Sequence, residues 1–386
     1  MRIAFVHQYF KTPDEGSGIR SWYLARAFVS AGHEVSILSA HNEKKGKHEV
    51  DGLTTHYQQI PYENKMGPFR RVLAFFQFVR FANKKLETLP KIDLLYVLST
   101  PLTTGLIARR ATKKLAIPYL FEVGDLWPDA PIQLGYLPNR WIQNRLYKFE
   151  EATYREAKEL VALSPAIKEA MEYRLDYSRT VEVIPNMSDC NFFVPRSTTT
   201  EHFDEQNPFV ITYAGAIGFA NHVQFLLDFA AECKNQRLPV RFSILGDGAE
   251  KASLMEASKE QNNIHWEQTG GKEAVKLSMI KSHAVFISYH DFSILETGSP
   301  NKLFDGLAAG QMIIINFGGW IKSLIESNEC GISYVPNNAP AGVHKLRQFI
   351  ESPLMVASYR ENARRLAETD FDVSLLTQKA LSVVTR

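Results

Sequence analysis

Residues 2–40 of the chain, RIAFVHQYFKTPDEGSGIRSWYLARAFVSAGHEVSILSA, decide its fold class. Residues 2–8 form a short apolar run with β-branched and aromatic side chains, which is typical of a buried strand. Residues 19–32 carry apolar side chains at helical spacing, and residues 33–40 form a second short apolar run. A strand, a helix and another strand in this order predict an α/β fold with a parallel, doubly wound sheet.

The same alternation continues along the chain and divides it into two series. Short apolar runs stand at 92–99, 118–123, 158–164 and 181–186, and again at 209–215, 240–248, 263–268, 284–289, 311–317 and 331–336. Between the two series, residues 194–208 are polar and rich in turn formers. We therefore expect two Rossmann-like domains, 1–195 and 208–365, joined by a linker over 196–207. Residues 366–386 predict a final helix that crosses back to the first domain.

Composition restricts the classes of function. The 386 residues are 45% hydrophobic and 22% charged, which is ordinary for a globular protein, and the net charge of +2 gives no reason to expect a nucleic-acid partner. The three cysteines, Cys190, Cys233 and Cys330, are far apart and fit a reducing compartment. The first residues predict a strand instead of a signal peptide, and no run of 18 apolar residues predicts a membrane span.

Three glycine pairs follow predicted strands, where a glycine-rich loop leads into a helix or turn. They are Gly16 and Gly18, Gly215 and Gly218, and Gly246 and Gly248. Glycine lets backbone N–H groups approach a phosphate at a helix N-terminus. Each pair alone is equally consistent with a tight connection between a strand and a helix. Together they suggest a cleft that binds a phosphorylated ligand at the carboxyl ends of two sheets.

The stretch ETGSPNKLFDGLAAG, residues 296–310, places charges in an unusual order. Ser299 and Pro300 predict a helix start, with Ser299 as N-cap, and Gly310 predicts its end. Lys302 then stands in the first turn, where the helix dipole disfavours a cation, and Asp305 follows one turn later. An anion held at this helix end explains the lysine, and a solvated side chain is the alternative.

Two further segments carry candidate residues. In FEVGDLWPDAP, Asp125 follows a strand and can position a sugar hydroxyl or act as a base; the alternative is a helix N-cap. Residues 64–85 are basic, with no acid, and have a broad aromatic face; the candidates for contact with a membrane or acceptor are Arg70, Arg71, Phe75 and Phe76. Such a helix fits an anionic membrane surface, and packing on the sheet with a solvated basic back is the alternative.

The motifs, taken in order, resemble the retaining nucleotide-sugar glycosyltransferases of the GT-B fold, family 4. The segments DLWPDA, VIPNMSD, ITYAGAIG, FSILGDGAE and SPNKLFDGLAAG carry this resemblance over nearly the whole chain. The DLWP and SPNK variants are most similar to bacterial transferases of O-antigen, capsule and exopolysaccharide synthesis, including N-acetylfucosamine transferases. The resemblance implies two Rossmann-like domains whose parallel sheets face each other across a cleft.

The resemblance also implies roles for individual residues. Asp305 resembles the second acid of the E-x7-E motif, which holds the ribose, and the loop of Gly298, Ser299, Pro300 and Asn301 resembles the segment that faces the sugar and phosphates. The first acid of the motif falls on Thr297, with Glu296 one residue early.

Three positions depart from the family pattern. The diphosphate-binding Arg and Lys of relatives fall on Ala216 and Asn221, and a usual His or Arg is Gly124. Arg20 and Lys302 can supply the missing charge; otherwise the site is weakened.

The resemblance implies transfer of a hexosyl group, with retention, from a nucleotide diphosphate sugar, expected to be UDP-linked, to a lipid-linked saccharide in cell-surface polysaccharide synthesis. Asp125, Lys302 and Glu296 are the candidate catalytic residues. Helix N-termini, backbone N–H groups and one or two cations can stabilise the departing diphosphate, so no metal or other cofactor is expected. The expected location is the cytoplasm, at the inner face of the membrane. Two alternatives stay open: a nucleotide-sugar 2-epimerase of the same fold, and a degenerate sugar-nucleotide-binding protein without catalysis.

Overall fold

The computed structural model describes residues 1–16, 19–62, 66–195, 202–334 and 338–386. Its first sheet has the strand order β3-β4-β2-β1-β5-β6-β7-β8. All neighbouring strands are parallel except β3 and β4, which form an antiparallel pair. The strands are β1 (Arg2–Val6), β2 (Glu34–His41), β3 (Gly46–Val50), β4 (Leu53–Gln59), β5 (Leu94–Leu98), β6 (Tyr119–Val123), β7 (Glu159–Ala162) and β8 (Glu182–Val183).

Helices connect these strands. They are α1 (Arg20–Ser30), α2 (Pro68–Leu86), α3 (Thr104–Leu115), α4 (Asp129–Gln133), α5 (Arg140–Glu156) and α6 (Pro165–Arg174). The chain reverses its direction of travel across the sheet at β1, which lies between β2 and β5. In open α/β sheets, ligands bind outside the carboxyl ends of the strands at such a reversal. The loop after β1 is therefore a favoured place for a site.

The second sheet is parallel throughout, in the order β11-β10-β9-β12-β13-β14. Its strands are β9 (Phe209–Ala216), β10 (Val240–Asp247), β11 (Ile264–Trp266), β12 (Ala284–Ile287), β13 (Met312–Ile315) and β14 (Gly331–Ser333). Its helices are α7 (Gln224–Asn235), α8 (Lys251–Ala257), α9 (Lys272–Ile280), α10 (Asn301–Ala308), α11 (Gly319–Ser327) and α12 (Ala339–Ile350). Here the reversal lies at β9. The predicted α/β fold with two parallel sheets is confirmed.

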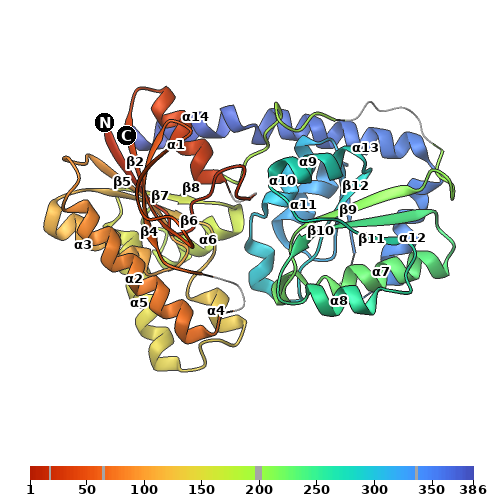
Figure 1. Ribbon diagram of the computed structural model, residues 1–386, viewed down its shortest axis with the longest axis horizontal. Helices are drawn as coiled ribbons and strands as arrows, with labels where there is room; N and C mark the ends of the chain where they lie inside the picture. Colours follow the sequence, from red (N-terminus) through yellow and green to blue (C-terminus); the bar gives the residue numbers. More distant parts are fainter. Residues whose placement is uncertain (17–18, 63–65, 196–201, 335–337) are drawn as a thin grey trace.

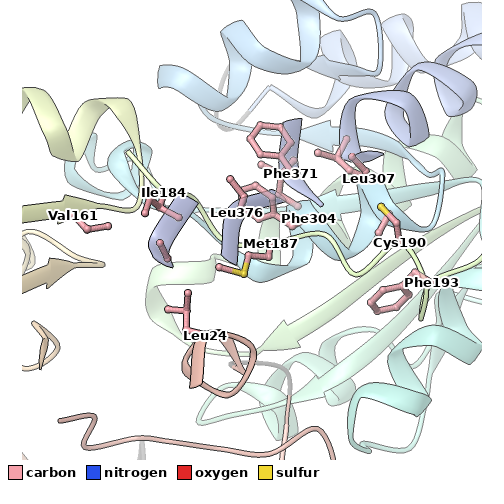
Figure 2. Close-up of a cluster of buried hydrophobic side chains, with 14 of the residues drawn as sticks. Leu24, Val161, Ile184, Met187, Cys190, Phe193, Phe304, Leu307, Phe371 and Leu376 are labelled. Carbon is pink, nitrogen blue, oxygen red and sulfur yellow. The ribbon is translucent and has the colours of Figure 1, made fainter. Parts of the chain in front are cut away.

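Two last helices connect the halves of the molecule. Helix α13 (Pro353–Leu366) contacts α10 and α12, and α14 (Val373–Val384) packs on α1 of the first half, as Figure 1 shows. A single buried cluster continues from one half to the other. Figure 2 shows Leu24, Met187, Phe304, Phe371 and Leu376 within it. Burial of these apolar side chains fixes the chain segment after β8 against both sheets.

The β3–β4 hairpin is absent from the sequence-based prediction. Its outer strand, GKHEV, is polar, because it lies at the edge of the sheet with most of its side chains near solvent. The turn between the strands uses Asp51 and Gly52, both with positive φ (51° and 77°). Edge strands carry little hydrophobic signal, and apolar periodicity therefore misses them.

Candidate active site

A pocket of about 620 Å³ lies between the two halves, at the carboxyl ends of β1, β9 and β10 and beside the start of α10. It brings together residues that are far apart in the sequence, from His7 to Asp305. Seven of the predicted donor-binding or catalytic residues line it: Gly16, Gly215, Gly246, Pro300, Asn301, Lys302 and Asp305. Gly18 lies outside the described residues. The other predicted site residues have different surroundings, described below.

At two positions beside this pocket, neighbouring atoms lie so close to the backbone that the residue is best a glycine. Gly215 has a φ of +151°, and a Cβ there would lie 3.2 Å from both Cε and Nζ of Lys302. A Cβ on Gly246 would lie 2.1 Å from the carbonyl oxygen of Gly215, which is impossible without a shift of the backbone. These glycines therefore open the floor of the pocket and let the lysine side chain pass over it.

Lys302 and Lys11 are the lysines that line the pocket in the described residues, and Lys302 lies at the start of α10. Its Nζ donates to the hydroxyl of Tyr213 and to Oδ1 of Asn221, both at 3.2 Å, and lies 4.3 Å from the centre of the Tyr213 ring. Within the part of the chain that the structure describes, no carboxylate forms an ion pair with it. Desolvation lowers its pKa to about 7. A partly buried ammonium with only neutral partners favours an anionic ligand, because such a ligand restores the charged form.

Asn221 explains one of the departures from the family pattern. It stands where the resemblance places a cation, but its amide oxygen accepts the hydrogen bond from Lys302. Ala216, at the second such position, lines the pocket without any polar side-chain atom. Lys302 thus takes its position from the residue that has replaced a cation.

Asp305 lies one turn further along α10, and its side chain is 6% exposed. Desolvation raises the pKa of its carboxyl group to about 7, the nearby charge of Lys272 opposes this rise, and Asp189 adds to it. The carboxylate lines the same pocket as Lys302. A buried carboxylate that opens into a polar pocket is suited to accept hydrogen bonds from ligand hydroxyls, such as those of a ribose.

Several residues of the loop before α10 are not among those that line this pocket, and their side chains have hydrogen-bond partners within the protein. Glu296 accepts a hydrogen bond from the backbone N–H of Gly318 at 3.0 Å, at the start of α11. The hydroxyl of Thr297 donates to the carbonyl of Ile294 at 2.7 Å. Glu296 and Thr297 are absent from the pocket lining and stabilise local turns in the structure.

Ser299 and Gly298 also form contacts within the fold. Helix α10 begins at Asn301, with Pro300 in the N-cap position, so Ser299 is not its N-cap. The Ser299 hydroxyl instead accepts from the backbone N–H of Asn186 at 3.2 Å, and the carbonyl of Gly298 accepts from Nε1 of Trp320 at 2.9 Å. These contacts fix the position of the loop that leads to Lys302, and they affect the pocket only by positioning that residue.

Arg20, predicted to contact the donor, instead contacts buried groups of the protein and is not among the residues that line the pocket. Its guanidinium donates to both carboxylate oxygens of Glu122, at 2.8 and 2.9 Å, and to the carbonyl of Pro185. Tyr96 also donates to Glu122. Arg20 and Glu122 are both buried, at 7% and 1% exposure. The charge of Arg20 is already paired, so it does not compensate for the missing family cations.

Asp125 is exposed, outside the lining of the pocket. Its Oδ2 lies 3.4 Å from the Thr100 hydroxyl, and neighbouring protein atoms desolvate it and raise its pKa. It also contributes to the raised pKa of Tyr289, after desolvation, and Tyr289 lines the pocket. Asp125 therefore stands near the rim. Gly124 before it lies in a turn where its N–H meets the Ser99 hydroxyl at 3.4 Å.

Two glycines of the second half have different roles. A Cβ on Gly248 would lie 2.0 Å from the carbonyl oxygen of Ile217, so this glycine permits two backbone segments to meet. Gly218 has open space around it. Neither lines the pocket, and their effect on a ligand is through the shape of the two turns.

Sequence reasoning missed several residues of the pocket. His7, Tyr9, Lys11 and Asp247 line it, and all four follow or end a strand. His7 is held by a 2.6 Å hydrogen bond between Nδ1 and the Ser21 hydroxyl, and burial lowers its pKa to about 3. Their residue types do not single them out; the sequence could have located them only because each follows β1 or ends β10.

Helix α2 shows which aromatic residues reach solvent. Phe69 and Phe76 are 81% and 52% exposed, and Arg70 is exposed beside them. Phe75 is buried against Tyr62 and Trp127, so its predicted place on the exposed face is wrong. Nε of Arg71 donates to the carbonyl of Met66 at 3.0 Å. In the described segments, no helix is both long and apolar enough to cross a bilayer.

Comparison with known proteins identifies the family. Residues 15–187 match the Glycosyl transferase 4-like domain, and residues 197–366 match the Glycosyl transferases group 1 family. Together these matches cover most of the chain. The chain belongs to the group 1 glycosyltransferases. No curated protein matches it at a significant level.

Solved structures of glycosyltransferases share the fold of this group 1 transferase over their whole length. Sucrose-phosphate synthase from Thermosynechococcus elongatus matches with a TM-score of 0.78 and 13% identity, over 100% of this chain and 98% of that one. Anabaena HepE, solved with UDP-glucose, matches with a TM-score of 0.71 and 16% identity, over 100% and 99%. WaaG, of lipopolysaccharide biosynthesis, matches with a TM-score of 0.70 and 16% identity, over 99% of both chains. At these identities the likeness shows the GT-B fold.

Proposed function

We propose that this transferase moves a hexosyl group from a UDP-linked sugar to a lipid-linked saccharide, with retention at the anomeric carbon, in the synthesis of a cell-surface polysaccharide. The proposal rests on the positions of Lys302 and Asp305, which lie one turn apart on α10 and both line the pocket between the two halves. A nucleotide diphosphate sugar presents a diphosphate and a ribose close together. The cation suits the first and the carboxylate suits the second.

Transfer of the hexosyl group requires that the departing diphosphate be stabilised. The bond between the anomeric carbon and the diphosphate oxygen breaks, the acceptor oxygen bonds to that carbon, and the acceptor proton is released. Lys302 and the start of α10 place positive charge where the diphosphate gains negative charge, without reorganisation of water. Asp125, at the rim, is the candidate for orienting hydroxyl groups. We name no protein nucleophile, and no metal enters this scheme.

The acceptor is expected in a second pocket of the first half. It has a volume of about 750 Å³ and is lined by residues at the ends of β1, β2 and β4, among them His41, Asn42 and Lys44. Tyr9 and Lys11 line both pockets. Because the two cavities share a wall, a saccharide in the second can present its hydroxyl to a sugar held in the first.

The exposed face of α2 supports a location at the inner face of an anionic membrane. Phe69, Val72, Leu73 and Phe76 are exposed at helical spacing, with Arg70 and Arg80 beside them. Apolar insertion and attraction to anionic lipid act together on such a helix. In a flotation assay with phosphatidylglycerol vesicles, Phe69→Ser/Phe76→Ser should release the protein. Undiminished binding would instead favour a helix face that only contacts solvent.

The decisive experiment incubates the protein with a panel of UDP-sugars, with and without lipid-linked saccharides, and follows the sugar by mass spectrometry and NMR. Transfer with retained anomeric configuration is the expected result. Conversion of the donor without acceptor would indicate an epimerase. Donor binding without transfer to any acceptor would indicate a degenerate, non-catalytic protein. Lys302→Met should lower kcat/KM by roughly tenfold to a thousandfold, the scale for one transition-state donor.

A further inference from the structure

A third cavity adjoins α2, and its wall is strongly basic. It has a volume of about 520 Å³ and lies between the end of β4 and one face of α2. Arg80, Lys84 and Lys85 of the helix line it, opposite Gln58 and Gln59 of the strand. On the helix, positions 77, 80, 81, 84 and 85 share one face, so the cations form a continuous row along the groove.

The cations of this groove have no acidic partners among the described residues. No ion pair joins Arg80, Lys84 or Lys85 to a carboxylate there, whereas Arg110 of the neighbouring helix α3 pairs with Glu87 at 2.7 Å. The pKa of the neighbouring His56 falls to about 4, first through desolvation and then through the charges of Lys85 and Lys47. The groove is therefore electropositive and favours an anionic ligand.

The groove continues the route from the reaction site. Ile60 lines both this groove and the acceptor pocket, and Tyr9 and Lys11 line both the acceptor pocket and the donor pocket. The order is thus donor pocket, acceptor pocket, basic groove. The groove also lies on the helix whose exposed aromatic face starts at Phe69. An elongated ligand in these cavities has its reactive end near Lys302 and its charged end near α2.

We propose that Arg80, Lys84 and Lys85 bind the diphosphate of the lipid-linked acceptor, while its saccharide occupies the pocket beyond Ile60. This inference rests on the proposed function, and it adds a binding site and a reason for selectivity. A diphosphate fixed on α2 sets how far the saccharide reaches toward the donor sugar. Acceptors of matching saccharide length are therefore favoured over shorter or longer ones.

The test measures binding without turnover. The probe is farnesyl diphosphate below its micellar concentration, titrated by calorimetry into the full chain without vesicles. Arg80→Gln/Lys84→Gln should weaken binding by roughly a hundredfold, because each charge-assisted contact is worth about tenfold. The matched control is Lys113→Gln/Lys114→Gln on α3, which removes the same charge outside the groove. It should bind as the wild type does.

Two further arms separate the groove from other anion sites. Lys302→Met should keep its affinity for farnesyl diphosphate; loss of binding there would place the diphosphate in the donor pocket and overturn the proposal. Phosphatidylglycerol vesicles test bilayer headgroups. If the Arg80/Lys84 variant lost vesicle binding but kept the probe, the groove would be a lipid-surface site and the proposal wrong. Failure of the proposed function is separate, since it appears as absent transfer with probe binding intact.

Discussion

The pKa of Lys302 leads to a specific prediction for donor binding. Burial in the protein lowers this pKa to about 7, against 10.5 for an ordinary lysine. A diphosphate diester beside Nζ favours the ammonium and raises the pKa again. Binding therefore takes up a proton when the pH exceeds 7. Below pH 7 the lysine is already charged, and its contribution is constant; above pH 7 the affinity falls as the free site loses its proton.

The size of the effect follows from the titration. At pH 8 about one site in eleven is protonated, so affinity should be roughly elevenfold below its low-pH limit, and it should fall about tenfold for each further pH unit. Calorimetry with the UDP-sugar that binds best, between pH 6.5 and 9 in buffers of different ionisation enthalpy, gives both the affinity and the proton uptake. The diester diphosphate of such a ligand keeps its charge over this range.

Lys302→Met is the control, because it keeps the length of the side chain and removes the titrating group. The variant should bind more weakly at pH 7 and should show no fall of this slope above pH 7. An equal slope in the wild type and the variant would refute the assignment, since another group would then be responsible. Proton uptake of zero in the wild type at pH 8 would refute it independently.

Further predictions concern binding and stability. Asp305→Asn should weaken binding of uridine as well as UDP, measured by calorimetry, because the carboxylate accepts from the ribose; its raised pKa of about 7 also predicts weaker wild-type binding of uridine as the pH falls below 7. Arg20→Met should lower the free energy of unfolding by about 3–5 kcal/mol in urea denaturation, because Glu122 stays buried without its partner. Phe304→Ala should cost about 3–5 kcal/mol in the same assay through a cavity in the cluster between the halves.

The sequence predicts the sheets well because their strands are buried on both faces. Residues 284–287 and 312–315 are continuously apolar, and they form β12 and β13 inside the second sheet. Edge strands such as β3 lack this signal. The glycine turns are located for the same reason, since Gly215 and Gly246 directly follow or end such runs.

The direction of a charged side chain is what the sequence leaves open. Arg20 and Lys302 both stand in the first turn of a helix after a glycine-containing loop, so pattern alone gives them the same role. Arg20 forms an ion pair with Glu122, which is 102 positions away in the sequence. Lys302 donates a hydrogen bond to the neutral Asn221, so its charge is not neutralised by this partner. The contacts between segments distant in the sequence are needed to distinguish an arginine in a structural ion pair from a lysine that is available to bind an anionic ligand.

A diphosphate site at Lys302 can be tested by comparing the binding of UDP with that of uridine at pH 7, in the wild type and in Lys302→Met. We expect the wild type to bind UDP much more tightly than uridine. Lys302→Met should remove at least tenfold of this preference and leave the affinity for uridine unchanged. Equal affinities for UDP and uridine in the wild type, or an unchanged preference in Lys302→Met, would contradict a diphosphate site at Lys302.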